Sequence, residues 1–310
     1  MNAVLQCLMH CSPLVEYFTQ NIHKRDALSP SHLKIGSSLA TTFAVTCHEV
    51  YSRPSRTSVN PSQLKESIAE LAPQFEGIEQ HDAHEFLRFF LDGLSEELKV
   101  EKRGELDQNN IEGLEPKEQS QFWWSKHVQA NSSIVSDLFC GQLRSTLICN
   151  TCQHQSYCFD PFYDLSLPLP KSISHVRNFA TSLKNKMVHA SKKEKIMKKG
   201  CVLDDCLQAL LEDELLSCTN TVICERCKER RECKKTLRIE KFPQVLVLHL
   251  KRFDNSRRKK NMPISIPLTG LNLAPFAAEK LYQLGSRNAL YDLFGRIDHS
   301  GSASRGHYVA

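Results

Sequence analysis

Long hydrophobic runs are missing from this chain of 310 residues. No segment approaches the roughly 18 consecutive apolar residues that mark a membrane-spanning helix, so the sequence predicts no membrane partner. The N-terminal segment Met1–Cys7 has neither the basic region nor the small-residue cleavage site of a secretory signal. We therefore do not expect secretion.

A strong charge imbalance and an internal repeat are also missing. The formal net charge is only +5, and the 41% hydrophobic and 24% charged content is that of a folded globular protein. A net charge this small does not by itself indicate a nucleic-acid partner. The sequence does not indicate an oligomeric state.

Cysteine is abundant, with thirteen residues in the chain. Without a secretory signal, that number indicates a reducing compartment, here the cytoplasm or the nucleus. In such a compartment thiols serve metal binding or catalysis more often than disulfides.

Four of the cysteines form two C-x-x-C pairs, Cys149 with Cys152 and Cys224 with Cys227. Two intervening residues let both thiolates of a pair face one ion, and two pairs complete a four-cysteine zinc site. Each pair follows an apolar, strand-like stretch, as in a zinc knuckle. A thioredoxin-like redox motif is the alternative, but it needs one pair and a βαβ setting. We expect the other cysteines outside the first third to be core or surface thiols: Cys140, Cys158, Cys201, Cys206, Cys218 and Cys233.

Helical spacing of apolar residues dominates the first third of the chain. Asp82 and Glu85 resemble a capping pair at the start of the strongest stripe. The expected helices cover 3–11, a short helix starting at the cap Ser12, 39–51, a helix starting at the cap Asn60, and 83–98.

Strand patterns and two insertions follow. Residues 99–120 indicate a loop, and the lysine-rich segment 178–200 indicates a solvated insertion, with a nuclear-import or nucleic-acid patch as the alternative. Alternation predicts a strand over 143–149, helical spacing predicts a helix over 203–215, and the apolar run 245–250 predicts a central strand buried on both faces.

The C-terminal segment predicts a hairpin. Tyr291–Ile297 alternates like a half-buried strand, His299–Gly306 suits a flexible connection, and His307 begins a second strand. A histidine there suits acid–base chemistry, and it also suits an ordinary surface position. The local pattern leaves both open.

Several motifs together resemble the ubiquitin-specific proteases, a family of papain-like cysteine proteases that cut after the C-terminal glycine of ubiquitin. The resemblance runs almost from end to end, and its order of motifs is specific. The motifs are Met1–Leu8, Gln80–Phe86, Asp137–Ser145, the two C-x-x-C pairs, Leu246–Phe253, and His299–Gly301 with Gly306–Tyr308.

This resemblance implies a single catalytic domain over 1–310 with an α+β, papain-like fold. Ubiquitin and ubiquitinated proteins would be the partners, and one structural zinc the only cofactor. The implied parts are a helical thumb (1–130), zinc-tipped β fingers (131–170 and 217–240), a basic insertion with a helix (171–216) and a β palm (241–310).

The resemblance also implies roles for three residues. His307 would be the general base, Asp82 would bind an arginine in the C-terminal tail of ubiquitin, and His299 would line the approach that admits only glycine.

One part of the family pattern has no match within 1–310. The nucleophilic cysteine is expected two residues before Met1, and the third member of the triad beyond Ala310. Cys7 and Cys11 lie on the apolar stripe of the first helix, where burial raises a thiol pKa. We therefore expect the chain to be a fragment of a deubiquitinating protease that is inactive by itself. The alternative is a ubiquitin-binding or zinc-ribbon interaction module without catalysis.

Overall fold

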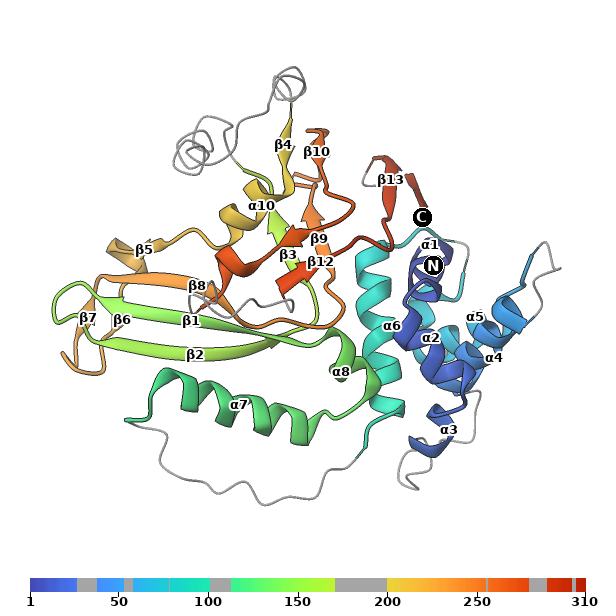
Figure 1. Ribbon diagram of the computed structural model, residues 1–310. Helices are drawn as coiled ribbons and strands as arrows, with labels where there is room; N and C mark the ends of the chain where they lie inside the picture. Colours follow the sequence, from blue (N-terminus) through green and yellow to red (C-terminus); the bar gives the residue numbers. More distant parts are fainter. Residues whose placement is uncertain are drawn as a thin grey trace. The chain divides into compact units, whose positions relative to one another are not determined.

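The computed structural model describes residues 1–26, 38–52, 58–77, 79–100, 113–170, 200–254, 256–278, 289–302 and 305–310 (Figure 1). The chain divides into two compact units. The first unit comprises Met1–Cys140, Pro243–Val245 and Phe294–Ala310, and the second comprises Gly141–Phe242 and Leu246–Leu293. The finer division into thumb, fingers and palm stays a prediction.

The first unit is helical and carries one hairpin, and its first helices gather together in Figure 1. Its elements are α1 (Asn2–Met9), α2 (Ser12–Thr19), α3 (His23–Asp26), α4 (Leu39–Ser52), α5 (Ser62–Leu71), η1 (Pro73–Phe75), α6 (Ala83–Glu97), α7 (Pro116–Ala130), α8 (Ile134–Phe139), β13 (Asp298–Gly301) and β14 (Gly306–Val309).

A chain of aromatic rings forms the core of this unit. The Phe18 and Phe43 ring centroids lie 4.9 Å apart, and the Phe43 and Phe90 centroids lie 5.1 Å apart, both pairs edge to face. All three side chains are fully buried. Edge-to-face aromatic pairs stabilise a core beyond the area that they bury, so α2, α4 and α6 are fixed against one another.

The expected helices are present, with corrected starts. Cys11 is the N-cap of α2 and not part of the first helix, because α1 ends at Met9. Ser12 is the first helical residue of α2, and its side chain makes no capping hydrogen bond. Before α5, Asn60 Oδ1 accepts from the Ser62 amide at 3.2 Å, so it closes a turn ahead of the helix.

The expected loop over 99–120 is wrong at its C-terminal end. α7 begins at Pro116, where Glu118 Oε2 accepts a hydrogen bond from the Glu115 amide at 3.1 Å. Proline at the first helical position suits a helix start, and this signal lies inside the polar stretch. Residues 101–112 lie outside the described residues.

The second unit is built on a four-stranded antiparallel sheet in the order β2-β1-β8-β5. Its strands are β1 (Gly141–Cys149), β2 (Gln155–Phe162), β5 (Glu214–Leu216) and β8 (Cys233–Lys241). The predicted strand over 143–149 is confirmed as part of β1. The helix predicted over 203–215 ends early, because Leu215 pairs with β8 in β5 and is 59% exposed.

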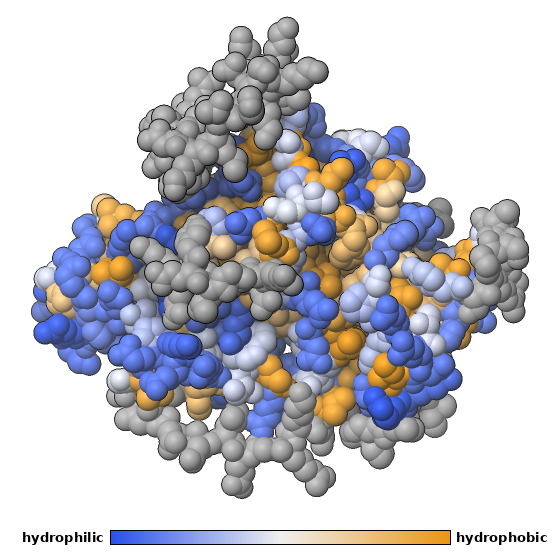
Figure 2. Space-filling model, in the orientation of Figure 1, coloured by the Kyte–Doolittle hydropathy of each residue, from blue (hydrophilic) through white to orange (hydrophobic). Residues whose placement is uncertain are grey.

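Shorter elements complete this unit. β3 (Leu165–Pro168) pairs parallel with β9 (Leu248–Lys251), and β4 (Cys201–Val202) pairs parallel with β10 (Ile264–Ser265). The others are α10 (Leu203–Leu210), η4 (Cys218–Asn220), β6 (Val222–Ile223), β7 (Arg230–Arg231), β11 (Leu271–Asn272), η5 (Ala274–Phe276) and β12 (Leu290–Tyr291). At the end of the four-stranded sheet where the β6–β7 pair lies, Figure 2 shows a mostly hydrophilic surface with a few hydrophobic spots.

Two strand predictions in the last third are wrong. The apolar run 245–250 is not a central strand buried on both faces, because only 248–251 forms a strand and its residues before Lys251 are half-buried. Val245 belongs to the core of the first unit, and its amide donates to Leu138 O at 2.8 Å. The expected strand over 291–297 breaks after Tyr291, two residues before the chain passes from the second unit to the first.

The lysine-rich segment 178–200 lies outside the described residues, except for Gly200. Among the helices that the structure describes, none has both the length and the apolar character to cross a bilayer.

Candidate functional site

The hairpin of the first unit carries both histidines of the predicted site. β13 pairs antiparallel with β14, and the register sets His299 opposite Tyr308 and Ser300 opposite His307. His299 lies in β13 and not in a flexible connection, which corrects that expectation. The second strand, β14, begins at Gly306, one residue earlier than expected, so His307 is its second residue, and its side chain is exposed.

The His299 ring packs over Gly306. A Cβ atom added to Gly306 would lie 1.9 Å from His299 Nε2, and the His299 ring centroid is 4.6 Å from that of Tyr308. The absence of a side chain at Gly306 therefore allows the ring to lie on the backbone of β14, immediately before His307.

The two carboxylate oxygens of Asp82, at the start of α6, accept hydrogen bonds from two different segments. Its Oδ1 accepts hydrogen bonds from the His84 amide at 2.8 Å and the Glu85 amide at 3.1 Å. Its Oδ2 accepts from the Tyr308 hydroxyl at 2.9 Å. Burial and the neighbouring Asp82 carboxylate raise the pKa of Tyr308 to about 12, so this hydroxyl is a donor at neutral pH.

A second bond joins the same two segments. The Gly306 amide donates to Gln80 Oε1 at 2.8 Å, across 226 residues of sequence. Asp82, His299 and the strand of His307 are thus brought together, while Tyr308 and Gln80, which hold them, were not among the predicted site residues. Because side chains alternate along a strand, His307 faces away from the side of β14 that Tyr308 occupies.

The pKa values of the Cys7 and Cys11 thiols are raised, although Cys11 is the N-cap of α2. Burial raises the pKa of Cys7, with a smaller opposing effect from the Arg296 backbone. Burial also raises the pKa of Cys11, and the Leu14 backbone lowers it less. A nucleophilic cysteine needs a depressed pKa. These directions agree with the sequence argument against both residues.

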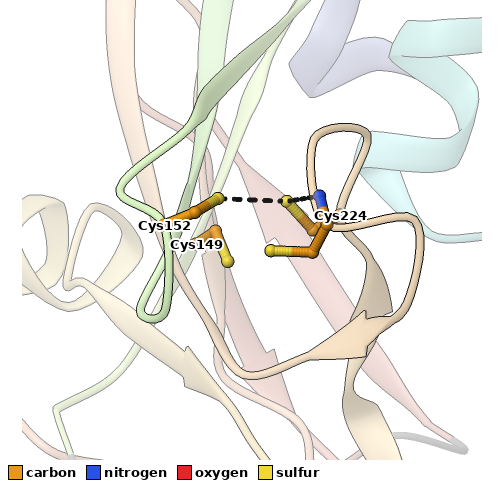
Figure 3. A group of neighbouring side chains, drawn as sticks. Cys149, Cys152 and Cys224 are labelled. Carbon is orange, nitrogen blue, oxygen red and sulfur yellow. Dashed lines mark hydrogen bonds between the residues drawn. The ribbon is translucent and has the colours of Figure 1, made fainter.

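The second unit brings the two C-x-x-C pairs together, as predicted. The sulfur atoms of Cys149, Cys152, Cys224 and Cys227 all lie within 4.8 Å of one another. Figure 3 shows the side chains of Cys149 and Cys152 extending from one turn toward that of Cys224 on another. The first turn follows β1 and the second follows β6.

The two turns have the same backbone design. Gln153 and Lys228 each follow a C-x-x-C pair, and their φ angles are 58° and 59°. The Gln153 amide donates to Cys149 O at 2.9 Å, and the Lys228 amide donates to Cys224 O at 2.8 Å. A left-handed backbone in a residue other than glycine is uncommon. Finding it twice at matching positions indicates two equivalent metal-binding knuckles.

The chemistry of the four thiols fits a soft divalent cation. Backbone hydrogen bonds from Cys152 and Thr151 lower the pKa of Cys149 to about 6. The thiol hydrogen bond with Cys152 raises the pKa of Cys227 to about 12. Four adjacent thiols cannot all ionise without a compensating charge, and a tetrahedral ion bound by thiolates supplies it.

Known proteins resemble the chain over its whole length. Residues 1–310 match the family described as ubiquitin carboxyl-terminal hydrolase. The chain is 34% identical to human ubiquitin carboxyl-terminal hydrolase 2 over 314 residues, which cover 100% of this chain and 47% of that protein. Rat ubiquitin carboxyl-terminal hydrolase 21 is 29% identical over 331 residues, covering 100% of this chain and 53% of that protein. The chain thus spans about half the length of these curated relatives.

Solved structures agree on the fold. The SAGA Ubp8/Sgf11/Sus1/Sgf73 DUB module bound to ubiquitin aldehyde contains a chain with a TM-score of 0.67 and 26% identity, covering 99% of this chain and 58% of that one. The module with a Ubp8 variant bound to monoubiquitin gives a TM-score of 0.70 and 25% identity, covering 99% and 57%. The predicted α+β, papain-like fold is confirmed. By sequence and by fold, the chain belongs to the ubiquitin carboxyl-terminal hydrolase family, as one of its ubiquitin-specific proteases.

Proposed function

We propose that this chain carries the histidine and the ubiquitin-tail site of a deubiquitinating cysteine protease, which hydrolyses the bond after the C-terminal glycine of ubiquitin. The proposal rests on two hydrogen bonds that join the histidine hairpin to the segment at the start of α6. The Tyr308 hydroxyl donates to Asp82 and the Gly306 amide donates to Gln80, and we call these two bonds the latch. The ubiquitin-bound state of the related Ubp8 chains supports the same substrate.

His307 is the general base in this proposal. Its imidazole is exposed at the start of a strand that two hydrogen bonds hold, so it is both accessible and fixed in place. A neutral imidazole removes the proton from a thiol and later returns one to the leaving amine. The rigid strand beneath the exposed ring keeps that geometry for both transfers.

Asp82 and His299 position the substrate tail. The Asp82 carboxylate accepts the Tyr308 hydroxyl, and we propose that it also pairs with an arginine of the ubiquitin tail. The His299 ring lies on the backbone of Gly306, next to Tyr308, and we propose that it lines the path of the ubiquitin tail. A narrow path there would admit glycine and exclude larger residues.

The nucleophile in this proposal is a cysteine outside residues 1–310. The raised pKa values of Cys7 and Cys11 argue against either residue in that role. The family pattern sets the nucleophile two residues before Met1, at the start of a helix, where the helix dipole lowers a thiol pKa. Residues 1–310 alone are then expected to bind ubiquitin without cleaving it.

We further propose that the four-cysteine site holds one structural zinc ion. Cys149, Cys152, Cys224 and Cys227 would bind it, and four protein ligands leave no open position for catalysis. The ion would contribute stability to the knuckles and no chemistry to hydrolysis. A site of four thiolate ligands fits a reducing compartment, which we propose is the cytoplasm or the nucleus.

Hydrolysis of a C-terminal ubiquitin fluorophore tests this proposal. We expect turnover by a chain extended at both ends to include the family cysteine and the third member of the triad, and none by residues 1–310. Titration of isotope-labelled ubiquitin with residues 1–310 should still shift the resonances of the ubiquitin tail. Robust turnover by residues 1–310 would show that the nucleophile is misassigned. Ubiquitin binding with no turnover by the extended chain would favour the interaction module instead.

A further inference from the structure

A fifth cysteine lies at the metal site. Cys233 begins β8 and stands directly opposite Cys149 of β1 in the strand register. The two side chains are each 2% exposed and pack in one cluster with Cys224. Cys233 is therefore not an isolated core thiol, as its sequence position suggested, although it is outside the group of four whose sulfurs lie within 4.8 Å of one another.

The hydrogen bonds around this pair define its geometry. The Asn150 amide donates to Glu232 O at 3.0 Å, so Asn150 and Glu232 form a hydrogen-bonded pair of the antiparallel ladder. The next pair, Cys149 and Cys233, is then a non-hydrogen-bonded pair, consistent with the Cys149 amide donating to His154 O. At such pairs the Cα atoms are about 4.5 Å apart and the side chains are closest.

This spacing suits a disulfide. A disulfide needs Cα atoms about 4.4–6.8 Å apart, so Cys149 and Cys233 can be joined without moving the strands. The Cys233 sulfur points toward the Arg231 carbonyl oxygen, at 3.7 Å, and also makes a thiol contact with Cys149. Cys149 is thus a proposed metal ligand, and Cys233, which is not a ligand, lies directly opposite it in the strand ladder.

We propose that a peroxide oxidises Cys149 and that Cys233 captures it in a reversible disulfide, which releases the metal ion. The inference rests on the proposed metal site, because Cys149 is one of its four ligands. Peroxide is the class of oxidant, and a dithiol reverses the reaction. Cys233 acts as the resolving cysteine, a thiol beside an oxidisable thiolate that traps its first oxidation product.

The reaction is balanced as two displacements. The Cys149 sulfur attacks one peroxide oxygen, the O–O bond breaks, and one water leaves after protonation, giving a sulfenic acid. The Cys233 sulfur then attacks the Cys149 sulfur, an S–S bond forms, the S–O bond breaks, and the Cys233 proton leaves with the second water. Two thiols lose two electrons in total, and one hydrogen peroxide gains them.

Because Cys233 is not one of the four metal ligands, a disulfide between Cys233 and Cys149 removes one ligand from the ion. Once Cys149 is bonded to Cys233, only Cys152, Cys224 and Cys227 remain as thiolate ligands, one short of the four-cysteine set, so the ion is bound more weakly and is released. Without a resolving thiol, a sulfenic acid proceeds to sulfinic and sulfonic acids, which a dithiol does not reverse. Reduction of the disulfide returns Cys149 to the site.

The test compares the zinc-loaded chain with Cys233→Ser and with the control Cys158→Ser, which removes an exposed thiol of β2. Each protein is treated with hydrogen peroxide, released zinc is followed with a chromogenic chelator, and free thiols are alkylated before peptide mass mapping. Dithiothreitol and zinc are then added, and zinc content is measured again. The readouts do not depend on ubiquitin hydrolysis.

We expect a peptide pair joined through Cys149 and Cys233, with the loss of two hydrogen atoms, in the wild type and in Cys158→Ser. Both should regain their zinc after reduction, and Cys233→Ser should not. Disulfides only within the C-x-x-C pairs, or full zinc recovery by Cys233→Ser, would overturn the proposal. If the unoxidised chain holds no zinc, the proposed metal site fails, and disulfide mapping of the metal-free chain still tests the pairing of Cys149 with Cys233.

Discussion

The Tyr308 hydroxyl donates a hydrogen bond of 2.9 Å to Asp82 Oδ2, across 226 residues of sequence. This bond connects the residue after the predicted general base with the residue predicted to bind the substrate tail. The same carboxylate caps α6 through its other oxygen. One side chain therefore links the start of a helix, the histidine hairpin and the proposed ubiquitin site.

Tyr308→Phe is predicted to weaken this latch. Removing a hydrogen bond to a carboxylate in an exposed position should lower the free energy of unfolding by about 1 kcal/mol, measured by urea denaturation. Tyr157→Phe is the matched control, because the Tyr157 hydroxyl donates only to the nearby Gln155 side chain. Equal stability losses in the two variants would contradict a special role for Tyr308.

The same bond predicts a dependence on alkaline pH. The folded-state pKa of Tyr308 is raised from 10 to about 12. A raised pKa stabilises the fold fully below the unfolded value, and this contribution is lost as pH rises from about 10 to about 12. The difference in stability between the wild type and Tyr308→Phe should shrink over that range. A difference that stays constant to pH 12 would contradict this.

Two substitutions at Asp82 should separate capping from binding. Asparagine is as good an N-cap as aspartate, whereas alanine at an N-cap costs about 1 kcal/mol. Asp82→Asn should therefore lower the free energy of unfolding less than Asp82→Ala does, because it keeps the cap and loses only the carboxylate acceptor of the Tyr308 hydroxyl. Both should weaken ubiquitin binding by at least about tenfold, because both remove the charge that pairs with arginine. Labelled-ubiquitin titration gives the affinities, and full affinity in Asp82→Asn would contradict the assigned role.

Gly306→Ala should disturb the hairpin. Its Cβ would meet His299 Nε2 at 1.9 Å, so the ring must move, at a cost of about 1–3 kcal/mol. Gly77→Ala is the control, because a Cβ there meets nothing closer than 3.8 Å. Adding His299→Ala should restore part of the stability that Gly306→Ala loses, as measured by urea denaturation, because the Cβ would still lie 2.8 Å from Ser300 O. No rescue in the double variant would show that the clash with His299 is not the cause.

Removal of metal should loosen the knuckles and leave the helices of the first unit intact. The cluster at the site consists of cysteines with Val222 and contains no larger apolar core, so the turns depend on the ion. After chelation, the Gln153 and Lys228 amides should exchange hydrogen at least about tenfold faster, as local opening becomes easier. The Phe86 amide, which donates to Asp82 O, serves as the internal reference. Unchanged exchange at Gln153 and Lys228 would contradict a metal-dependent turn.

Local signals in the sequence were sufficient for several parts of the structure. The spacing of Asp82 and Glu85 predicted the helix cap, and the C-x-x-C pairs predicted four converging thiols. The left-handed turns were not predictable, because Gln153 and Lys228 are not residues that favour that backbone. Their conformation follows from closing each turn on its own cysteine carbonyl.

Long-range contacts account for the remaining differences. No local pattern pairs Tyr308 with Asp82 or Gly306 with Gln80. The apolar run 245–250 was predicted as one buried strand because periodicity does not reveal that the chain changes units after Val245. Hydrophobic patterns indicate which residues are buried, and the topology decides where.

The most direct test of the general base is the hydrolysis of a C-terminal ubiquitin fluorophore by the chain extended at both ends and carrying His307→Gln. His10→Gln, an exposed histidine at the end of α1, is the control. Loss of the base should reduce kcat/KM by about 10²–10⁴-fold, while the control stays within about twofold of the wild type. A His307→Gln variant as active as the control would contradict the assignment of His307 as the general base.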